Sequence, residues 1–385
     1  MTIELESQIS TLNPADPGFS KSRFCRLLMS WYSENKQDLP WRSLWRKFSN
    51  PYHVWVSEIM LQQTLIRVVI PVYERFIETF PTPLSLARAS EDDVRKMVRG
   101  LGYYRRFRYL HKGVRELTGA NEENNFQEDP DWQWPETFSE WKKVSGVGDY
   151  TAAAVSSICF DTPKGVVDGN VERVLCRVFD IRLPSNLPAL KKRFQQVVDD
   201  IISEDCPGDF NQGLMEIGQH VCLPGQPKCD VCPVRRYCKA NKNSSTDLAP
   251  APKVKAKTTD VYLRLTILKG EGRYGLLRRP DCAKFLKETE GFLTEIKKAR
   301  SFKTDGHLKA YGAVRHSLSK RLKHSITQHR IEAEVSVMAL NKSQMKDSHL
   351  SHLRWLLPEE VEENLISNLD RKAWKIYLSE HGPGL

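Results

Sequence analysis

Residues 222–238 read CLPGQPKCDVCPVRRYC and place Cys222, Cys229, Cys232 and Cys238 in the pattern C-x6-C-x2-C-x5-C. This short run holds four of the nine cysteines of the chain, which is typical of a metal-ligand arrangement. Four thiolates can bind one zinc ion or the irons of a 4Fe-4S cluster. Zinc sites favour two short C-x2-C pairs, whereas this run has one short pair between wider gaps. The spacing therefore favours an iron–sulfur cluster, with zinc as the alternative.

The composition is that of a soluble globular protein. The 385 residues are enough for two domains with cores of their own, and 40% are hydrophobic and 28% charged. Residues 1–20 are polar, and no window approaches 18 consecutive apolar residues, so neither a signal peptide nor a membrane span is predicted. We expect an intracellular protein, cytoplasmic or, in a eukaryote, nuclear, where thiolates escape oxidation.

The positive charge is concentrated in one part of the chain. The formal net charge is +10, yet residues 252–330 alone contain 20 Lys/Arg against 7 Asp/Glu, a net +13 that leaves about −3 for the remainder. Such asymmetry indicates a polyanionic partner, with nucleic acid favoured over an anionic membrane. A solvated basic surface is the alternative.

Hydrophobic periodicity predicts two domains of different class. Residues 21–242 carry apolar residues at helical spacing, as in residues 24–31, 54–68 and 152–158, with stops at prolines such as Pro51, Pro71 and Pro83. We expect a flexible tail over residues 1–20 and a linker over 243–259. Residues 261–267, 274–277 and 331–337 alternate as half-buried strands do, so residues 260–385 should form an α+β domain that ends in a helix over 358–379.

Two further segments combine glycine with a tight turn before a helical pattern. The run VSGVGDYTA, residues 144–152, joins two helical patterns through Gly146 and Gly148, and such a turn before a helix N-terminus can hold a phosphate. A plain helix–helix turn would also explain it. The run VVDGNV, residues 166–171, places Asp168 on a tight turn, where it can cap the following helix.

Together these features resemble the helix–hairpin–helix DNA glycosylases of the endonuclease III superfamily. The resemblance is dense over residues 20–240. Within it, VWVSEIMLQQT (54–64) is similar to the signature of the adenine-specific, MutY-type branch, as are LPWR (39–42), GLGYY (100–104) and FNQ (210–212). Tyr150 occupies the position where the lyases of the superfamily carry their Schiff-base lysine, and no imine can form without that amine. The resemblance implies a mainly α glycosylase core, a six-helix barrel plus an iron–sulfur domain, before the second domain.

The resemblance also implies roles for two carboxyl groups. Hydrolysis of an N-glycosidic bond needs a protonated acid for the leaving base and an ionised group near the sugar cation. Glu58, followed by three apolar residues, should lie in an apolar pocket and protonate adenine N7. Asp168 should stay ionised and face C1′, with Asn170 and Tyr150 as supporting hydrogen-bond partners. Without the family match, Glu58 could equally be a solvated residue of its helix.

Other family positions imply contacts with DNA. Trp41, Arg42, Leu61 and Gln212 should line the adenine pocket, while Gln63 and Tyr103 should wedge into the base stack as adenine leaves it. Arg235, Arg236 and Lys239 lie in or beside the cysteine loop, so the cluster should be a structural element that presents cations to phosphates.

The second domain resembles, more loosely, the Nudix-like module that reads 8-oxoguanine in this family. Residues 322–329 align with its recognition loop, where the usual aromatic-Ser-His triplet appears as Ile326-Thr327-Gln328 and His329 is one residue further on. The resemblance thus implies Thr327, Gln328 and His329 as recognition residues, and no Nudix-hydrolase run is present. We expect a monomer that excises adenine opposite 8-oxoguanine or guanine in duplex DNA. The alternatives are a bifunctional endonuclease III-type glycosylase/lyase for oxidised pyrimidines and a non-catalytic DNA-binding homologue.

Overall fold

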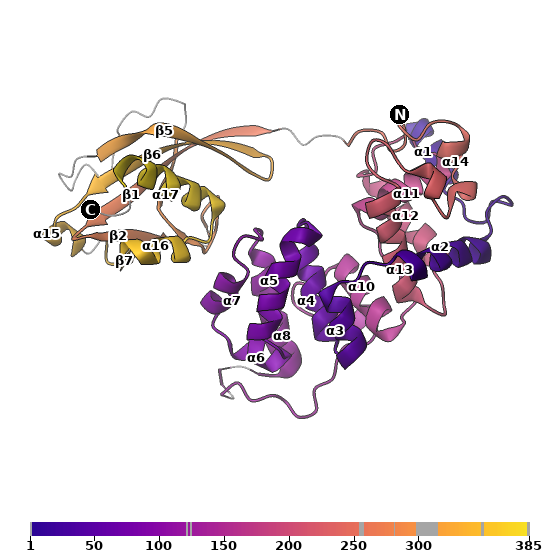
Figure 1. Cartoon of the computed structure of the whole chain (residues 1–385), viewed down its shortest axis with the longest axis horizontal. Coiled ribbons are helices and arrows are strands. Elements are labelled where there is room, and N and C mark those ends of the chain that lie inside the picture. Colours follow the sequence, from indigo (N-terminus) through magenta and orange to yellow (C-terminus); the bar gives the residue numbers. More distant parts are fainter. Residues whose placement is uncertain are drawn as a thin grey trace. The chain divides into compact units, whose positions relative to one another are not determined.

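The structure, a computed structural model, describes residues 2–120, 122–123, 125–253, 258–280, 282–297, 315–347 and 350–382. It contains two compact units, one formed by residues 1–97 and 103–254 and the other by residues 98–102 and 255–385 (Figure 1). In the described residues no helix is long and apolar enough to cross a membrane.

The first unit is helical throughout its described part, as predicted. Proline at the first helical position starts several of its helices, because proline lacks the N–H that a helix start leaves unpaired. The elements are α1 Thr2–Ser10, α2 Lys21–Asn35, α3 Pro40–Phe48, α4 Pro51–Leu61, α5 Ile66–Thr79, α6 Pro83–Arg88, α7 Glu91–Met97, α8 Arg105–Thr118, α9 Phe138–Trp141, α10 Asp149–Phe160, α11 Gly169–Phe179, α12 Pro188–Ile201, α13 Pro207–Glu216, the π-helical turn η1 Ile217–Val221, the 3-10 turns η2 Cys229–Val231 and η3 Arg235–Tyr237, and α14 Lys239–Lys242.

Pro71 does not end a helix, contrary to the prediction. It is the sixth residue of α5 and therefore removes one hydrogen bond from the helix interior. Val72, Tyr73 and Phe76 of the same helix are buried, so tertiary packing holds α5 together across the proline. The predicted stops at Pro51 and Pro83 are confirmed as helix starts.

The two segments expected to be flexible are partly packed. In the predicted tail, residues 2–10 form α1, Leu12 is fully buried and Arg193 donates to its carbonyl oxygen. In the predicted linker, the buried Arg177 side chain donates to the carbonyl oxygens of Thr246 and Ala249 at 3.0 Å. Both expectations rest on polar composition, and composition does not reveal the contacts that a few residues of each segment make with distant helices. Residues 254–257 lie outside the described part.

The second unit is an α+β domain, as predicted. Its strands are β1 Thr259–Gly270, β2 Arg273–Arg278, β3 Glu290–Gly291, β4 Leu293–Lys297, β5 Arg315–Ile326, β6 His329–Ala339 and β7 Leu353–Leu356, in the order β3-β2-β1-β6-β5, with β4 paired to β1 and β7 to β2. Strands β1 and β6 run parallel, whereas β5 and β6 form an antiparallel hairpin.

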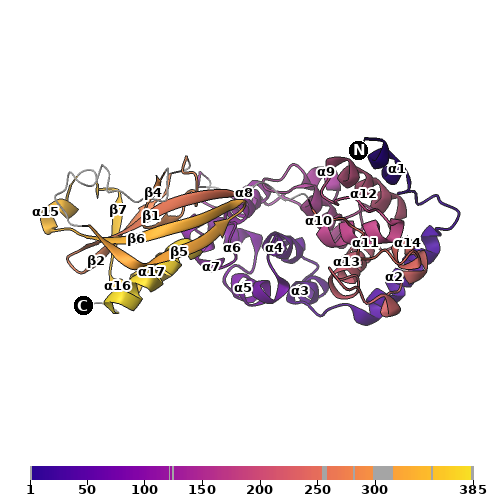
Figure 2. The same cartoon turned by 90° about the horizontal axis from the view of Figure 1, so that it is seen from above.

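Helices complete the second unit. They are α15 Lys342–Met345, α16 Pro358–Asn364 and α17 Asn368–His381 (Figures 1 and 2). The single helix predicted over 358–379 is thus two, since Ser367 caps α17 by accepting from the backbone N–H groups of Leu369 and Asp370. Trp374 and Tyr377 of α17 pack into the same core as Leu263 and Leu265 of β1.

Candidate active site

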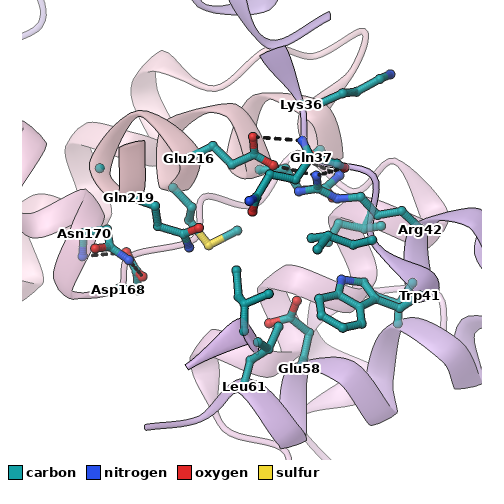
Figure 3. Close-up of a pocket in the computed structure, with 18 of the residues that line it drawn as sticks. Lys36, Gln37, Trp41, Arg42, Glu58, Leu61, Asp168, Asn170, Glu216 and Gln219 are labelled. Carbon is teal, nitrogen blue, oxygen red and sulfur yellow. Dashed lines mark hydrogen bonds and ion pairs between the residues drawn. The ribbon is translucent and has the colours of Figure 1, made fainter. Parts of the chain in front are cut away.

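A cavity of about 1050 Å³ opens in the first unit. Its lining residues come from α2, α3, α4 and α5 and from α10, α11, α13 and η1, and Figure 3 labels some of them. All four predicted catalytic residues and all four predicted adenine-pocket residues line it: Trp41, Arg42, Glu58, Leu61, Tyr150, Asp168, Asn170 and Gln212. Residues from several helices therefore converge on one space, which is large enough for a nucleoside.

Glu58 reaches the cavity from an almost entirely buried helix. The first ten residues of α4 are buried, Glu58 is only 6% exposed, and its Oε2 has no hydrogen-bond partner among the residues that the structure describes. Burial raises the pKa of Glu58 to about 7, although interactions with the Tyr150 hydroxyl and the Arg42 charge oppose the rise. A large fraction of this carboxyl is therefore protonated at neutral pH.

Asp168 has a different, polar environment. As the N-cap of α11 its Oδ1 accepts from the backbone N–H groups of Asn170 at 2.9 Å and Val171 at 2.8 Å, and its Oδ2 accepts from Asn170 Nδ2 at 2.7 Å. Burial raises the pKa of Asp168 above its usual value, and these hydrogen bonds and the Arg173 charge oppose only part of that rise. The predicted cap is confirmed, and the hydrogen bonds favour the ionised form.

Tyr150 interacts with both carboxyls. Burial and the charges of Glu58 and Asp168 raise the pKa of its hydroxyl well above the usual range, so the group is a neutral donor. Its hydroxyl contacts Met215 Sδ at 3.4 Å. The position therefore offers a hydrogen-bond donor but no amine.

A cluster of hydrogen-bonded side chains, Arg42, Gln212 and Glu216, forms the end of the cavity away from Asp168. Arg42 Nε donates to Gln212 Oε1 at 2.7 Å, and Arg42 Nη1 lies 2.5 Å from Oε1 of the buried Glu216 (Figure 3). Arg42 also donates to the carbonyl oxygen of Gln37 at 2.9 Å. Because Arg42 binds both Gln212 and Glu216, these three side chains are held in place before any ligand enters the cavity.

Arg173 ties the Asp168 turn to the cysteine loop. Its guanidinium donates to Asn170 Oδ1 at 3.0 Å, to the Gly218 carbonyl oxygen at 2.6 Å and to the Cys222 carbonyl oxygen at 2.8 Å. Asn170 in turn donates to Asp168. A continuous set of hydrogen bonds therefore runs from the first cysteine to the carboxylate.

The two predicted wedge residues lie on neighbouring loops. Gln63 and Tyr103 are exposed, Tyr103 by 52%, and both have left-handed backbones, at φ +57° and +48°. The buried Arg106 at the start of α8 donates to the carbonyl oxygens of Met60 and Gln62, and to Thr64 Oγ1 at 2.9 Å. It thereby joins the Gln63 turn to the Tyr103 loop. Such strained, exposed residues are frequent at functional sites.

The glycine turn between α9 and α10 has two unlike glycines. Gly146 has φ +79°, and a Cβ there would lie 2.4 Å from Tyr109 Cβ. Gly148 caps α10 with φ −89°, and a Cβ there would meet no atom within 4 Å. Gly146 is therefore needed by the fold, whereas Gly148 leaves free space in front of a helix N-terminus.

The cysteine loop winds around the buried Arg177. Nη1 of Arg177 lies 3.3 Å from Cys222 Sγ, and the backbone carbonyl oxygen of Arg177 accepts from Cys238 Sγ at 3.3 Å. Burial and, to a lesser extent, interactions with the other cysteines raise the pKa of Cys229, Cys232 and Cys238. In the part that the structure describes, no group of three or more His, Cys, Asp or Glu has the arrangement of a metal site. The donor set, four cysteine thiols on one short loop, nevertheless fits a thiolate-bound cluster in its chemistry.

The cations beside this loop are partly paired within the chain. Arg235 Nη1 lies 2.9 Å from Asp230 Oδ1, and Lys239 Nζ lies 2.8 Å from Asp16 Oδ2 of the N-terminal segment. The Arg236 guanidinium lies over the Tyr237 ring at 5.5 Å.

The predicted recognition loop of the second unit is the tip of the β5–β6 hairpin. Thr327 and Gln328 are exposed, and Thr327 has φ +51°, which is rare for a β-branched residue. His329, in contrast, is half-buried and its ring packs edge-on against Phe285 with centroids 5.2 Å apart.

The chain is similar in sequence to known DNA repair proteins. The model of the HhH-GPD superfamily of base excision DNA repair proteins matches residues 56–197. The adenine DNA glycosylase of Rattus norvegicus is 41% identical over 224 residues, 57% of this chain and 42% of the rat protein. That of Buchnera aphidicola from Schizaphis graminum is 35% identical over 252 residues, 65% of this chain and 69% of the relative. The chain belongs to the adenine DNA glycosylase family.

A solved thermostable thymine-DNA glycosylase has the same helical fold, with a TM-score of 0.50 at 22% identity over 60% of this chain and all of that one. The chain spans 42% and 41% of the length of the rat and mouse adenine DNA glycosylases that it matches.

Several residues that build this cavity are not among those predicted from the sequence. Glu216 and Gln219 line the cavity, and Arg106 and Arg173 hold its loops. Helical spacing was a usable signal for Arg173, which lies three residues after Asn170 on the same helix. Arg106 carried no such signal, because its partners are more than 40 residues away.

Proposed function

We propose that this chain is a monofunctional DNA glycosylase that removes adenine paired with 8-oxoguanine or guanine in duplex DNA, in base excision repair. The observation that carries the proposal is the presence of Glu58 and Asp168, two carboxyls in unlike environments, on one cavity. One carboxyl is buried among apolar residues and the other is held by backbone N–H groups. This is the division that acid-assisted cleavage of a glycosidic bond requires.

In this mechanism the adenine nucleotide leaves the base stack and enters the cavity. Protonated Glu58 gives its proton to adenine N7 as the C1′–N9 bond breaks and its electron pair moves to the base. Ionised Asp168 faces the positive charge that develops at C1′, and water completes the hydrolysis. Trp41 and Leu61 offer apolar contact to the base, while Arg42, Gln212 and Glu216 offer a fixed polar surface.

The lyase alternative requires an amine that could form an imine with C1′. Tyr150 provides a neutral hydroxyl between the two carboxyls instead. This difference favours simple hydrolysis, so the abasic strand should remain uncut until alkali is added.

Duplex DNA is the proposed partner of both units. Gln63 and Tyr103 would enter the stack, Gly146 and Gly148 would hold a phosphate, and Thr327, Gln328 and His329 would read 8-oxoguanine. Cys222, Cys229, Cys232 and Cys238 would bind a 4Fe-4S cluster, which supplies covalent cross-links to the loop, and Arg235 and Arg236 would face phosphate. The protein would act as a soluble monomer, in the cytoplasm or nucleus.

The test is the Glu58→Gln variant in single-turnover excision from end-labelled duplexes with adenine opposite 8-oxoguanine. Glutamine keeps the size of the side chain but cannot donate the proton, so we expect base release to fall by at least roughly 10²-fold while duplex binding is kept. A thymine glycol duplex and omission of alkali test the lyase alternative. Release by Glu58→Gln at close to the wild-type rate would exclude Glu58 as the acid.

A further inference from the structure

Gln219 places a primary amide in the cavity, and the proposed mechanism does not use this group. It lies on η1, a π-helical turn between α13 and the first cysteine. π-helical turns are rare and frequently occur at functional sites. In Figure 3 its side chain points into the cavity from the η1 wall, whereas Glu58 enters from the α4 wall opposite.

The turn is held firmly beside the Asp168 end of the cavity. A Cβ on Gly218 would lie 2.5 Å from Asn170 Cβ, so η1 packs directly on the Asn170 turn. Arg173 fixes the same contact, because it donates to the Gly218 carbonyl oxygen and to Asn170 Oδ1. The Cys222 N–H also donates to the Ile217 carbonyl oxygen at 2.7 Å across the turn. The position of the Gln219 backbone is therefore set by several contacts.

The side-chain amide of Gln219 differs from the other amides of the cavity in its hydrogen bonding. In the described residues no group forms a hydrogen bond with the Gln219 side chain, although the neighbouring amides are used. Asn170 donates to Asp168 and accepts from Arg173, and Gln212 accepts from Arg42 and donates to the Gly208 carbonyl oxygen. A polar group fixed in a cavity without a protein partner is available to a ligand.

The chemistry of a purine nucleoside then assigns its partner. If Glu58 faces N7 and Asp168 faces C1′, the purine edge on the other side of the glycosidic bond carries N3, a hydrogen-bond acceptor. That edge faces the wall opposite Glu58 at the sugar end, which is where Gln219 lies (Figure 3). We infer that the Gln219 amide donates a hydrogen bond to N3 of the flipped adenine, an inference that rests on the proposed function.

This contact would assist the reaction as well as recognise the base. Electron density builds up on the purine as the C1′–N9 bond breaks, so a donor at N3 binds the transition state more strongly than the ground state. The hydrogen bond transfers no proton. Gln219 is thus a specificity-determining residue that acts on the leaving group opposite Glu58.

The experiment compares 2′-deoxyadenosine with 3-deaza-2′-deoxyadenosine, in which N3 is a C–H group, opposite 8-oxoguanine. Single-turnover excision rates are measured for the full-length wild type and for Gln219→Met, which keeps the length of the side chain but cannot donate. The ratio of the two substrates' rates in the wild type is divided by the same ratio in the variant, so intrinsic reactivity cancels. We expect this double ratio to be roughly ten, the size of one hydrogen bond.

Gln196→Met is the matched control, since Gln196 is an exposed residue of α12 outside the cavity, and its double ratio should be one. Gln219→Ala is measured beside Gln219→Met in case methionine packs badly, and the circular dichroism of each variant checks its folding. A double ratio of one for both Gln219 variants overturns the inference and leaves the proposed function intact. Absence of adenine release by the wild type overturns both.

Discussion

At the scale of single residues, the protonation of Glu58 links the buried α4 helix to the chemistry. Its folded-state pKa of about 7 lies above the ordinary value of 4.5 because the carboxyl is buried. Only the protonated form can donate, so base release should fall as the pH rises through about 7, and the Glu58→Gln variant should lack this step. Single-turnover rates from pH 5 to 9 test it, and a wild-type profile flat across this range would contradict it.

The same shift makes a prediction for stability. Because the pKa of Glu58 is higher in the folded than in the unfolded state, the folded state binds the proton more tightly. Its contribution to the free energy of unfolding is complete below pH 4.5 and is lost as the pH rises through about 7. Removing the ionisable group should therefore stabilise the protein at high pH, by up to roughly 3 kcal/mol. We expect the Tm of Glu58→Gln relative to wild type to increase between pH 5 and pH 8.5. An equal difference at both pH values would show that the carboxyl is not buried as described.

Asp168 has two functions that substitution can separate. Asparagine can still cap α11, whereas it carries no charge to oppose the cation at C1′. Asparagine has one acceptor oxygen where Asp168 uses two, so Asp168→Asn should keep the cap but lose the hydrogen bond from Asn170 Nδ2, with a smaller fall in Tm than Asp168→Ala. We expect it to lose roughly 10²-fold or more in the rate of base release. Asp168→Ala, the comparison variant, should lose the cap as well, about 1 kcal/mol of stability. Equal rates for Asp168→Asn and wild type would remove Asp168 from the mechanism.

At the scale of elements, the turn between α9 and α10 provides a matched pair of glycines. Gly146→Ala should cost roughly 2–4 kcal/mol, because alanine is strained at positive φ and its Cβ meets Tyr109. Gly148→Ala should leave the Tm nearly unchanged but weaken DNA binding, since its methyl group projects where a phosphate would approach. Thermal denaturation and a DNA-binding titration on both variants distinguish the two effects. Undiminished DNA affinity in Gly148→Ala would argue against a phosphate at this turn.

The individual helices and strands show how much of the fold could be predicted from the sequence. Local patterns were sufficient for the helical unit, for three strands of the sheet and for the motifs around Glu58 and Asp168. They failed at Pro71, where buried neighbours outweigh a lost hydrogen bond, and at Leu12, whose burial depends on distant helices. Arg177 shows the same limit, because its partners lie in two segments about 45 and 70 residues further along the chain.

At the scale of the whole molecule, charge and core are divided between the units. Residues 252–330 carry net +13, and all but the first few belong to the second unit. The first unit contains the complete cavity and a core of its own, which includes Leu12, Phe194 and Leu214. The chemistry and most of the excess positive charge are therefore encoded in separate parts of the chain.

This division makes the truncated chain of residues 1–253 informative. It should fold, bind iron and release adenine in a Glu58-dependent manner, because the cavity and the cysteine loop lie within it. It should bind DNA with a shallower dependence of log K on log[salt], since phosphate contacts from the basic segment are lost. It should also discriminate less between adenine opposite 8-oxoguanine and adenine opposite guanine. Thr327→Ala in the full chain is the matched comparison for the hairpin tip, and a truncated protein with full discrimination would show that the second unit does not read the opposite base.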